Sequence, residues 1–255
     1  MKQEKDDIAL ISYTSNNFLK WAEIYLKSLK LSNPDVKVFM HCINVTEENQ
    51  KKLVEWNQNV IVSPINIKYD GIQERISGSG PEAMWKIMMH CQVSKAILAG
   101  LESNVAKRYI LTDVDMLITS AFTKNLINLD CDIGLCFTKE HIHRNPPQIL
   151  NGAIYINTES QKYDAIKEFF KMYDTMNDTN IKHYVDQTKL YECFEKFKNK
   201  LRIVDLGFDY FLNFFVNNAI MWSAHRGDKN KNYKLFKKAL KENNIQVESK
   251  DNYEK

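Results

Sequence analysis

The fold is decided by the stretch Lys107-Arg108-Tyr109-Ile110-Leu111-Thr112-Asp113-Val114-Asp115-Met116-Leu117-Ile118. Its apolar run is short and bounded by charged residues, which predicts a buried strand of an α/β sheet. Because residues i and i+2 of an extended chain project to the same side, we expect Asp113 and Asp115 to aim at one point. Two neighbouring carboxylates need a cation or hydrogen-bond donors to offset their charge, and hard divalent ions take such oxygen ligands. We therefore interpret the pair as the holder of a metal-bound diphosphate.

The same Asp-x-Asp pattern recurs at Asp130-Cys131-Asp132, so the spacing alone does not identify a metal site. This second copy lies where a helical pattern gives way to a strand pattern, and we expect a solvated turn there. The first copy differs because it follows a strand, and ligands of α/β proteins gather outside the carboxyl ends of strands.

The composition bounds the class of protein. A chain of 255 residues that is 44% apolar and 26% charged suits one α/β domain, or one domain with a small appendage. The net charge of +3 is too small to argue for a nucleic-acid partner. Five cysteines without a Cys-x-x-Cys pair predict free thiols rather than disulfides or a zinc site. The N-terminus lacks a signal-peptide pattern and no 18 apolar residues run together, so we expect a cytoplasmic protein unless it is recruited to a membrane surface.

Strand and helix patterns alternate at the start of the chain. Strands are expected over Ile8–Ser12, Val36–Ile43 and Val60–Ile67, with helices over Phe18–Leu31 and Thr46–Trp56 between them. This β-α-β-α-β order predicts a parallel sheet with right-handed crossovers. The polar stretch before the first helix either caps that helix or offers its N-terminal N–H groups to a ligand.

The remaining segments continue the α/β pattern. Helices are expected over Glu82–Leu101, Ser120–Leu129, Thr158–Met176 and Tyr184–Lys198, strands over Ile133–Phe137, Ile149–Asn157 and Ala219–Ala224, a loop over Tyr69–Pro81, and an aromatic core segment over Phe208–Val216. We predict one domain over residues 1–229, built on a mixed, mostly parallel central sheet flanked by helices. A basic C-terminal helix and tail over residues 230–255 complete the chain.

Lysines dominate the C-terminal helix. From Lys229 to Lys241 there are six lysines and no acid. The helical stretch at residues 230–243 presents either a solvated face or a patch that meets anionic lipid or an anionic acceptor. Lys95, on the long helix that leads into the central strand, is likewise either solvated or placed to meet a phosphate.

Four segments, in order along the chain, resemble metal-dependent GT-A glycosyltransferases, especially those of family 8. They are a strand with a polar loop (Ile8–Phe18), a strand followed by Asp-x-Asp (Tyr109–Asp115), a strand that opens with Asn-Gly-Ala (Asn151–Asn157), and a His-x-Gly-x-Lys motif (His225–Lys229). Between the last two, Tyr184-Val185-Asp186-Gln187 is similar to an Asp-Gln pair of that family. The likeness covers most of the chain.

Three positions depart from the family pattern. Ser15 stands where the first loop commonly carries an acidic residue. The third segment reads Asn-Gly-Ala rather than Asn-Ala-Gly, and the last motif is one residue shorter before its lysine and lacks the Pro-Trp that follows.

The resemblance implies a single GT-A, Rossmann-like domain that moves a sugar from a nucleotide-sugar donor, usually UDP-linked, with manganese or magnesium. It implies that Asp113 binds the ribose and the metal, and that Asp115 binds the metal directly. His225 is the third implied metal ligand, which suits manganese because this ion accepts imidazole as well as oxygen. A histidine after an apolar strand also has a simpler reading as a capped or solvated side chain.

The other implied roles divide by ligand. They are Ser12, Thr14 and Asn17 for the base and ribose, Lys95, Gly227 and Lys229 for the diphosphate, and Asn151, Asp186 and Gln187 around the transferred sugar and the acceptor. Asp186 has an alternative role as the N-terminal charge of a helix. Family 8 members retain anomeric configuration, so retention is expected here. The acceptor, whether a glycan, a lipid-linked sugar or a protein, is not identified by these motifs.

Two other functions compete with this interpretation. A haloacid-dehalogenase-type phosphohydrolase would use Asp113 as its nucleophile, with Asp205 and Asp209 as a later acidic pair, but its nucleophilic strand usually opens the core. A non-catalytic module that binds nucleotide or glycan is the second. A sugar nucleotidyltransferase is rejected because the segment Tyr13–Asn17 contains no glycine to cradle phosphate.

Overall fold

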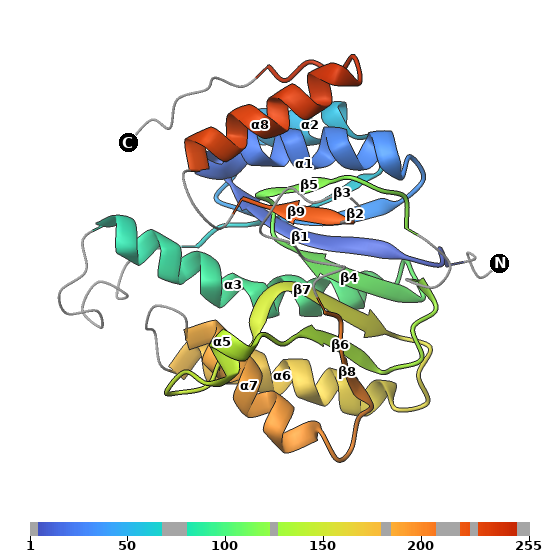
Figure 1. The fold of residues 1–255 in the computed structure, drawn as a ribbon, viewed down its shortest axis with the longest axis vertical. Coiled ribbons are helices and arrows are strands. Elements are labelled where there is room, and N and C mark those ends of the chain that lie inside the picture. Colours follow the sequence, from blue (N-terminus) through green and yellow to red (C-terminus); the bar gives the residue numbers. More distant parts are fainter. Residues whose placement is uncertain are drawn as a thin grey trace. The chain divides into compact units, whose positions relative to one another are not determined.

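The computed structural model describes residues 5–67, 81–122, 127–179, 185–207, 220–224 and 229–248. The chain forms two compact units. The first contains Met1–Ile11, Asn66–Leu111 and Asp130–Gly207, and the second contains Ser12–Ile65, Thr112–Leu129 and Phe208–Lys255. Their helices and strands are labelled in Figure 1.

Seven strands form one sheet in the order β3-β2-β1-β4-β7-β6-β8. Their bounds are β1 Ala9–Ser15, β2 Lys37–Ile43, β3 Val60–Ile65, β4 Arg108–Thr112, β6 Ile133–Cys136, β7 Leu150–Asn157 and β8 Ile203–Asp205. The pairs β1–β4, β2–β3 and β6–β8 are parallel, and β6–β7 is antiparallel. The predicted mixed, mostly parallel sheet is therefore confirmed.

Strands β1 and β4 are buried, as expected for parallel strands covered on both faces. Every residue of β1 is buried, and so is every residue of β4 after Arg108. Their register pairs Ala9 with Tyr109 and Ile11 with Leu111, a constant offset of 100 residues. Gly100 lets the preceding helix approach this pair, because a Cβ there would lie 2.5 Å from Cδ1 of Ile11.

The helices of the first unit are α3 (Pro81–Ser103), α5 (Lys139–Ile142), α6 (Tyr163–Thr179) and α7 (Val185–Phe197). Helix α6 packs against both α3 and α7. Its fully buried Phe169 lies edge-on to Phe170 and Phe197, with ring centroids 5.0 and 5.6 Å away. Aromatic side chains thus join α6 to α7, as their large apolar area favours.

The second unit holds the short helix η1 (Asn16–Phe18), helices α1 (Leu19–Ser32), α2 (Glu47–Trp56) and α8 (Lys229–Glu242), and a two-stranded sheet of β5 (Met116–Ile118) and β9 (Met221–Ser223). Helix α1 is central to this unit, because it contacts α2, β5 and α8. Thr46 caps α2, and its hydroxyl accepts the N–H of Asn49 at 3.4 Å, as a threonine before a helix is expected to do.

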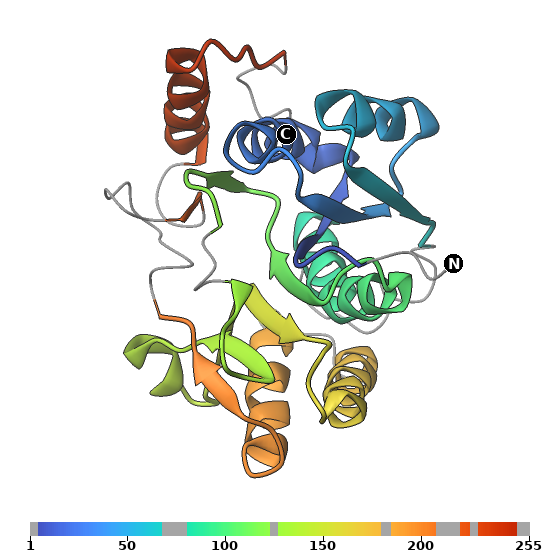
Figure 2. The ribbon, with the colours of Figure 1, turned by 90° about the vertical axis from the view of Figure 1, so that its right-hand side faces the viewer.

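Helix α8 packs against α1 and lies next to it in Figures 1 and 2. The contact is aromatic: Trp21 lies edge-on to Tyr233 at 5.2 Å and to Phe236 at 5.9 Å between ring centroids. The ammonium group of Lys20 lies 5.0 Å from the Tyr233 ring. The basic helix is therefore packed within the second unit. The predicted domain boundary between residues 229 and 230 stays a prediction.

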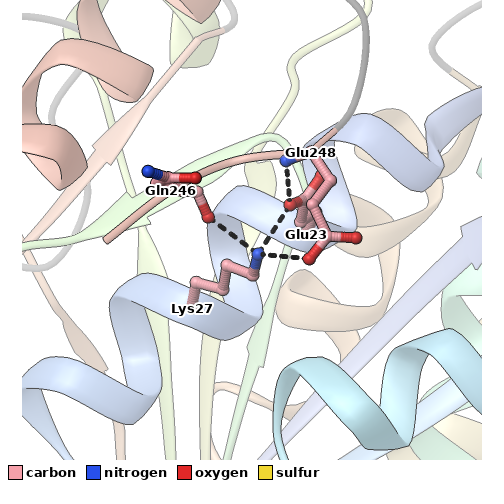
Figure 3. A network of polar contacts seen from close by, with 4 residues as sticks. All are labelled: Glu23, Lys27, Gln246 and Glu248. Carbon is pink, nitrogen blue, oxygen red and sulfur yellow. Dashed lines mark hydrogen bonds and ion pairs between the residues drawn. The ribbon is translucent and has the colours of Figure 1, made fainter. Parts of the chain in front are cut away.

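The segment after α8 is tied back to α1 by a polar network (Figure 3). Nζ of Lys27 lies 2.8 Å from Oε1 of Glu23 and 2.8 Å from the carbonyl oxygen of Gln246. It also reaches a carboxylate oxygen of Glu248 at 3.3 Å. The backbone N–H of Glu248 donates to Oε1 of Glu23 at 2.6 Å, so the fully buried Glu23 has two donors.

Several predicted elements differ from those observed. Strand β1 continues through Ser15 rather than ending at Ser12. The helix expected from Ser120 is wrong at its start, because residues 120–122 are not helical. Asn33 holds them instead: its side chain donates to the Ser120 carbonyl at 3.0 Å and accepts the N–H of Phe122 at 2.7 Å. The sheet of β5 and β9 was not anticipated. Residues 69–80 and 208–216 lie outside the described parts.

The second Asp-x-Asp is not the solvated turn that was expected. Asp132 is buried, and its carboxylate accepts the N–H of Arg202 at 2.7 Å and the hydroxyl of Ser160. Only Asp130 is exposed, paired with the Arg202 guanidinium. Both bonds to Asp132 come from residues distant in sequence, which no local pattern reveals.

All five cysteines are free and buried, as predicted. Burial raises the pKa of four of these thiols from the ordinary value of 9.0 to about 12; they are Cys42, Cys131, Cys136 and Cys193. Within the described ranges, every helix is too short or too polar to cross a membrane.

Candidate functional site

The predicted acidic pair follows the end of β4 in the second unit. Asp113 comes directly after Thr112, the last residue of the strand, and Val114 and Asp115 form a bend before β5 begins. The pair therefore does not lie in a strand, so strand alternation does not set where the two carboxylates point, and their convergence stays a prediction. The chain bends here because Met116 pairs with β9 instead of continuing the large sheet.

Asp113 is held by a tyrosine from the neighbouring strand. The phenol hydroxyl of Tyr13 donates to Oδ1 of Asp113 at 2.7 Å. Tyr13 lies two residues beyond Ile11, and Asp113 two beyond Leu111, so the contact continues the offset of the β1–β4 register. A hydrogen bond to a carboxylate is shorter and stronger than one between neutral groups.

A cluster of hydroxyl groups surrounds Thr112, the residue before Asp113. Ser12 donates its hydroxyl to the Thr112 carbonyl at 2.9 Å, and the Tyr25 hydroxyl lies 2.6 Å from Oγ1 of Thr112. Burial raises the pKa of Tyr25, the hydrogen bonds of Thr112 and Ser12 lower it, and the charge of Asp113 adds a smaller increase. These hydroxyls join β1, β4 and α1.

Strand alternation divides the polar residues of β1 into two sets. Ser12 and Thr14 project to one side and Tyr13 and Ser15 to the other, because successive side chains alternate. The contact with Asp113 belongs to the second set. Ser12 and Thr14 are fully buried, and the Thr14 hydroxyl donates to the adjacent Ser15 carbonyl at 3.4 Å. Their predicted contact with a nucleotide stays a prediction.

Ser15 and Tyr13 are the residues that sequence reasoning missed as side-chain donors. Ser15 is 1% exposed, and its hydroxyl has no hydrogen-bond partner within the part of the chain that the structure describes. A buried hydroxyl of this kind is uncommon and asks for an explanation. A predicted strand that continued to residue 15 would have placed the side chains of Tyr13 and Ser15 on the same side by alternation.

The asparagines after β1 behave differently from one another. Asn16 donates to the Asn44 carbonyl at 3.1 Å and accepts from the Asn49 side chain at 3.1 Å, which ties η1 to the turn before α2. Asn17 is exposed in η1. Neither Ser15 before η1 nor Phe18 before α1 caps its helix with a side-chain hydrogen bond, so the capping interpretation of this stretch is not supported.

Asp115 is joined to the far end of the chain. The backbone N–H of Ala224 donates to its carbonyl oxygen at 2.9 Å, directly beyond the β5–β9 pair of Met116 and Ser223. The Asp115 side chain belongs to a residue only 7% exposed. His225 and Gly227 lie outside the described residues, as does the side chain of Lys229.

The predicted metal ligands lie only partly within the described residues. Over residues 5–67, 81–122, 127–179, 185–207, 220–224 and 229–248, no cluster of three or more histidine, cysteine, aspartate or glutamate side chains could hold a metal ion. Two of the three predicted ligands, Asp113 and Asp115, lie within this part. Their carboxylates are hard oxygen ligands that suit magnesium or manganese.

The residues predicted to surround the sugar meet in the first unit. Nδ2 of Asn151, on β7, donates to a carboxylate oxygen of Asp186, at the start of α7. Asp186 is fully buried, and a carboxylate in the first turn of a helix is favoured by the helix dipole. The neighbouring Gln187 is 4% exposed, and its Oε1 has no hydrogen-bond partner among the described residues. Its backbone carbonyl accepts the N–H of Ile149 at 3.1 Å.

Lys95 lies on α3 and faces α6. Its ammonium group is 3.7 Å from Oδ1 of Asp174, which also accepts the Ser94 hydroxyl at 2.8 Å. The pair is partly exposed, so it adds little to stability. Contact between Lys95 and a diphosphate stays a prediction, and it requires this ion pair to open.

Asp205, the first member of the rival acidic pair, has a structural role. Its Oδ1 accepts the backbone N–H groups of Phe137 at 3.1 Å and Gly207 at 2.9 Å. Gly207 has a positive φ of 64°, which a glycine adopts readily in such a turn. The carboxylate thus closes the end of β8, while Asp209 lies outside the described residues.

Solved structures with a similar fold are glycosyltransferases. The galactosyltransferase LgtC in complex with donor and acceptor sugar analogues has 11% identity and a TM-score of 0.57, covering 89% of this chain and 94% of LgtC. The bifunctional glycosyltransferase WbbM has 10% identity and a TM-score of 0.58, covering 94% of this chain and 50% of WbbM. GlyE of Streptococcus pneumoniae TIGR4 has 10% identity and a TM-score of 0.54, covering 95% of this chain and 66% of GlyE.

Sequence comparison adds nothing to these likenesses. No protein-family model and no curated protein sequence matches this chain. At 10–11% identity the solved structures show the fold and not the activity. The chain has a GT-A-like α/β fold, as the four sequence segments implied.

Proposed function

We propose that the protein is a glycosyltransferase that moves a sugar from a nucleotide-diphosphate donor, UDP-linked, to an acceptor hydroxyl with retention of configuration. One observation carries the proposal: the hydrogen bond from Ala224 N–H to the Asp115 carbonyl. His225 follows Ala224 directly in the chain. Asp115 is therefore hydrogen-bonded to the residue that directly precedes the predicted imidazole ligand, although the two ligands are more than 100 residues apart in sequence.

The donor set fits manganese. Asp113 and Asp115 supply hard oxygen atoms, and an imidazole from His225 would complete a set that manganese accepts and calcium does not favour. A bound divalent ion would offset the negative charge that develops on the leaving diphosphate. Lys229, four residues after His225, would add a second positive charge to the same phosphate groups.

The chain's own residues have three tasks in this reaction. Asp113 and Asp115 hold the charged end of the donor, with Asp113 itself held by Tyr13. Asn151, Asp186 and Gln187 would surround the sugar and the acceptor. The bond from the anomeric carbon to the diphosphate oxygen breaks, a bond to the acceptor oxygen forms, and the acceptor hydroxyl passes its proton to the departing diphosphate.

The buried amide of Gln187 supports this assignment of the sugar residues. Burying a carbonyl oxygen without a partner costs free energy, and a sugar hydroxyl is a donor that would satisfy it. Asn151 and Asp186 hold each other, which fixes the carboxylate next to that amide in sequence. The LgtC structures include an active-site mutant in which a glutamine is replaced by glutamate, at 11% identity over 91% of this chain.

The phosphohydrolase alternative has less support. Asp205 holds two backbone N–H groups and closes a strand end, so it is occupied in the structure rather than presented to a phosphate. The strand before Asp113 lies in the middle of the seven-stranded sheet, in a fold similar to that of solved glycosyltransferases. Phosphatase activity that is lost in Asp113→Asn, without any turnover of UDP-sugars, would establish the alternative.

Donor hydrolysis tests the proposal directly. The chain is incubated with Mn²⁺ and a panel of UDP- and GDP-sugars, and free nucleotide is measured. Asp115→Ala should reduce turnover by about 10²–10³-fold, by analogy with the loss of one charged stabiliser of a developing anion. Asp130→Ala is the matched control, since Asp130 is the exposed member of the other Asp-x-Asp. Equal activity in both variants, or no hydrolysis of any donor by the unmodified chain, would refute the proposal.

A peripheral contact with anionic membrane is a separate proposal. Tyr233, Phe236 and Leu240 are buried, so the apolar side of α8 is used in packing on the second unit. Four of the exposed residues of the helix are lysines, namely Lys231, Lys234, Lys238 and Lys241; the others with described side chains are Asn230, Leu235 and Glu242, which lies 3.9 Å from the ammonium group of Lys238. Such a face would be attracted to anionic lipid through charge rather than insertion.

A further inference from the structure

Two buried tyrosines donate or share hydrogen bonds beside the predicted metal ligands, and they contact different kinds of group. Tyr13 donates to the carboxylate of Asp113 at 2.7 Å. Tyr25 lies 2.6 Å from the hydroxyl of Thr112, the residue before Asp113. Both rings belong to the core, at 9% and 0% exposure. The cluster therefore contains one phenol on the carboxylate and a comparable phenol one residue away.

The ring of Tyr13 is fixed by its strand. All seven residues of β1 are buried, and β1 pairs with β4 in a register that continues toward Tyr13 and Asp113. A side chain locked in a core samples few rotamers, so its hydroxyl has a defined position. Asp113 lies directly after the last residue of β4, in a segment that is neither helix nor strand, and the Tyr13 hydroxyl contacts one of its carboxylate oxygens.

Proteins orient metal-binding carboxylates with hydrogen-bond donors whose own positions are fixed. Ligating carboxylates are themselves hydrogen-bonded, and loss of such an outer partner typically lowers metal affinity 10- to 100-fold. Removing the donor would also leave more negative charge on the carboxylate, which favours cation binding. Orientation outweighs this gain because the affinity of a small divalent ion depends steeply on ligand geometry.

We propose that Tyr13 is a positioning residue: its hydroxyl fixes the plane of the Asp113 carboxylate so that Asp113 and Asp115 can serve one divalent cation. The inference rests on the proposed function, since it concerns the same cation. Tyr13 is not among the ligands that the family resemblance implies. It would touch neither the cation nor the sugar. Its effect is therefore on affinity for the metal rather than on the chemical step.

Tyr13→Phe tests the assignment, with Tyr25→Phe as the matched control. Each variant removes one buried hydroxyl and keeps the ring. Binding of Mn²⁺ is measured from the loss of the free-ion EPR signal at a fixed concentration of UDP, and the Mn²⁺ dependence of donor hydrolysis is measured in parallel. We expect Tyr13→Phe to weaken Mn²⁺ binding about 10- to 100-fold. The rate at saturating Mn²⁺ should stay within about 2-fold of the original, because the residue does not take part in the chemical step.

Tyr25→Phe should leave the Mn²⁺ affinity unchanged, even though it removes a hydrogen bond of similar length. Rescue supplies a further readout: Tyr13→His keeps a ring and an N–H donor, and should recover part of the lost affinity. Should Tyr13→Phe fail to fold, Asp113→Glu replaces it. That variant keeps the charge and moves the carboxylate by one methylene away from the Tyr13 hydroxyl, and Mn²⁺ affinity should fall.

The outcomes separate the inference from the proposed function. Equal Mn²⁺ affinities for the original chain, Tyr13→Phe and Tyr25→Phe would overturn the role of Tyr13 and leave the metal site in place. An unchanged Mn²⁺ affinity in Asp113→Glu would also overturn the role of Tyr13, because a carboxylate moved away from that hydroxyl would then bind the ion equally well. If the original chain binds no Mn²⁺ in the presence of UDP and hydrolyses no donor, the proposed function falls and the role of Tyr13 falls with it.

Discussion

Lys27→Met is expected to destabilise the second unit far more than a surface lysine substitution does. Lys27 and Glu23 are spaced i and i+4 on α1, and Nζ of Lys27 lies 2.8 Å from Oε1 of Glu23 (Figure 3). Glu23 is fully buried and the Lys27 side chain is 15% exposed. Methionine keeps most of the methylene packing and removes the charge, so the change isolates the polar contacts.

The expected loss in the free energy of unfolding depends on the hydrogen-bond donors that Glu23 keeps in the variant. Removing one partner of a buried ion pair typically costs about 3–5 kcal/mol, because the other charge stays buried. Here Glu23 retains the N–H of Glu248, at 2.6 Å, as a second donor. The other two acceptors on Lys27 lie in the C-terminal segment and become solvated when it is released. We therefore expect a loss of about 2–3 kcal/mol in the free energy of unfolding, near the value of one hydrogen bond to a charged group.

Urea denaturation followed by tryptophan fluorescence measures this loss, since Trp21 lies on α1 against α8. Hydrogen exchange over residues 244–248 reports separately on release of the C-terminal segment. Lys52→Met is the matched control: Lys52 and Glu48 on α2 have the same spacing and are 3.0 Å apart, but their side chains are 44% and 80% exposed. Lys52→Met should change the stability by less than the error of measurement.

Equal effects of Lys27→Met and Lys52→Met would refute this account of the network. So would a large loss of stability with unchanged exchange at residues 244–248, because the segment would then be held by something other than Lys27. A variant with Glu23→Gln and Lys27→Met together should recover part of the loss, since it leaves no buried charge without its partner.

Four further predictions concern a buried hydroxyl, the buried thiols and the basic helix. Ser15→Ala should not lower the free energy of unfolding, because the hydroxyl has no partner among the described residues. If a nucleotide hydrogen-bonds to this hydroxyl, UDP affinity measured by calorimetry should fall several-fold. A loss of stability with unchanged UDP affinity would contradict this prediction. The four thiols with pKa raised from 9.0 to about 12 are neutral at pH 8, so a disulfide reagent should modify them only at the rate of unfolding; rapid labelling of the native chain would be the opposite result. Since these pKa values are raised by folding, stability should also fall as the pH rises from about 9 to about 12 in a denaturation series. Lys234→Glu with Lys238→Glu should abolish co-sedimentation with phosphatidylserine vesicles at low salt, whereas neutral vesicles should bind neither form; unchanged binding would make α8 an ordinary solvated face.

Local patterns in the sequence determined the elements of this protein. The alternation of short apolar runs with amphipathic stretches depends on residues a few positions apart, and it predicted the parallel order of the sheet. Thr46 was a local signal for the start of α2, and the structure confirms its cap. The odd set of cysteines predicted free thiols, and all five are free. The resemblance of four ordered segments pointed to the GT-A-like fold in the same way.

Only the tertiary structure decided which side chains meet. Asp113 and Asp115 were expected to converge by strand alternation, but they lie in a bend that exists because β5 pairs with a strand more than 100 residues later. The face of β1 that touches Asp113 carries Tyr13 rather than Ser12 or Thr14, because the strand register sets it. Pairing between distant segments depends on how the whole chain packs, and the same local pattern is compatible with several registers. For that reason the sequence determined the candidate residues, whereas the contacts of Tyr13, Asp115 and Glu23 were decided by the folded chain.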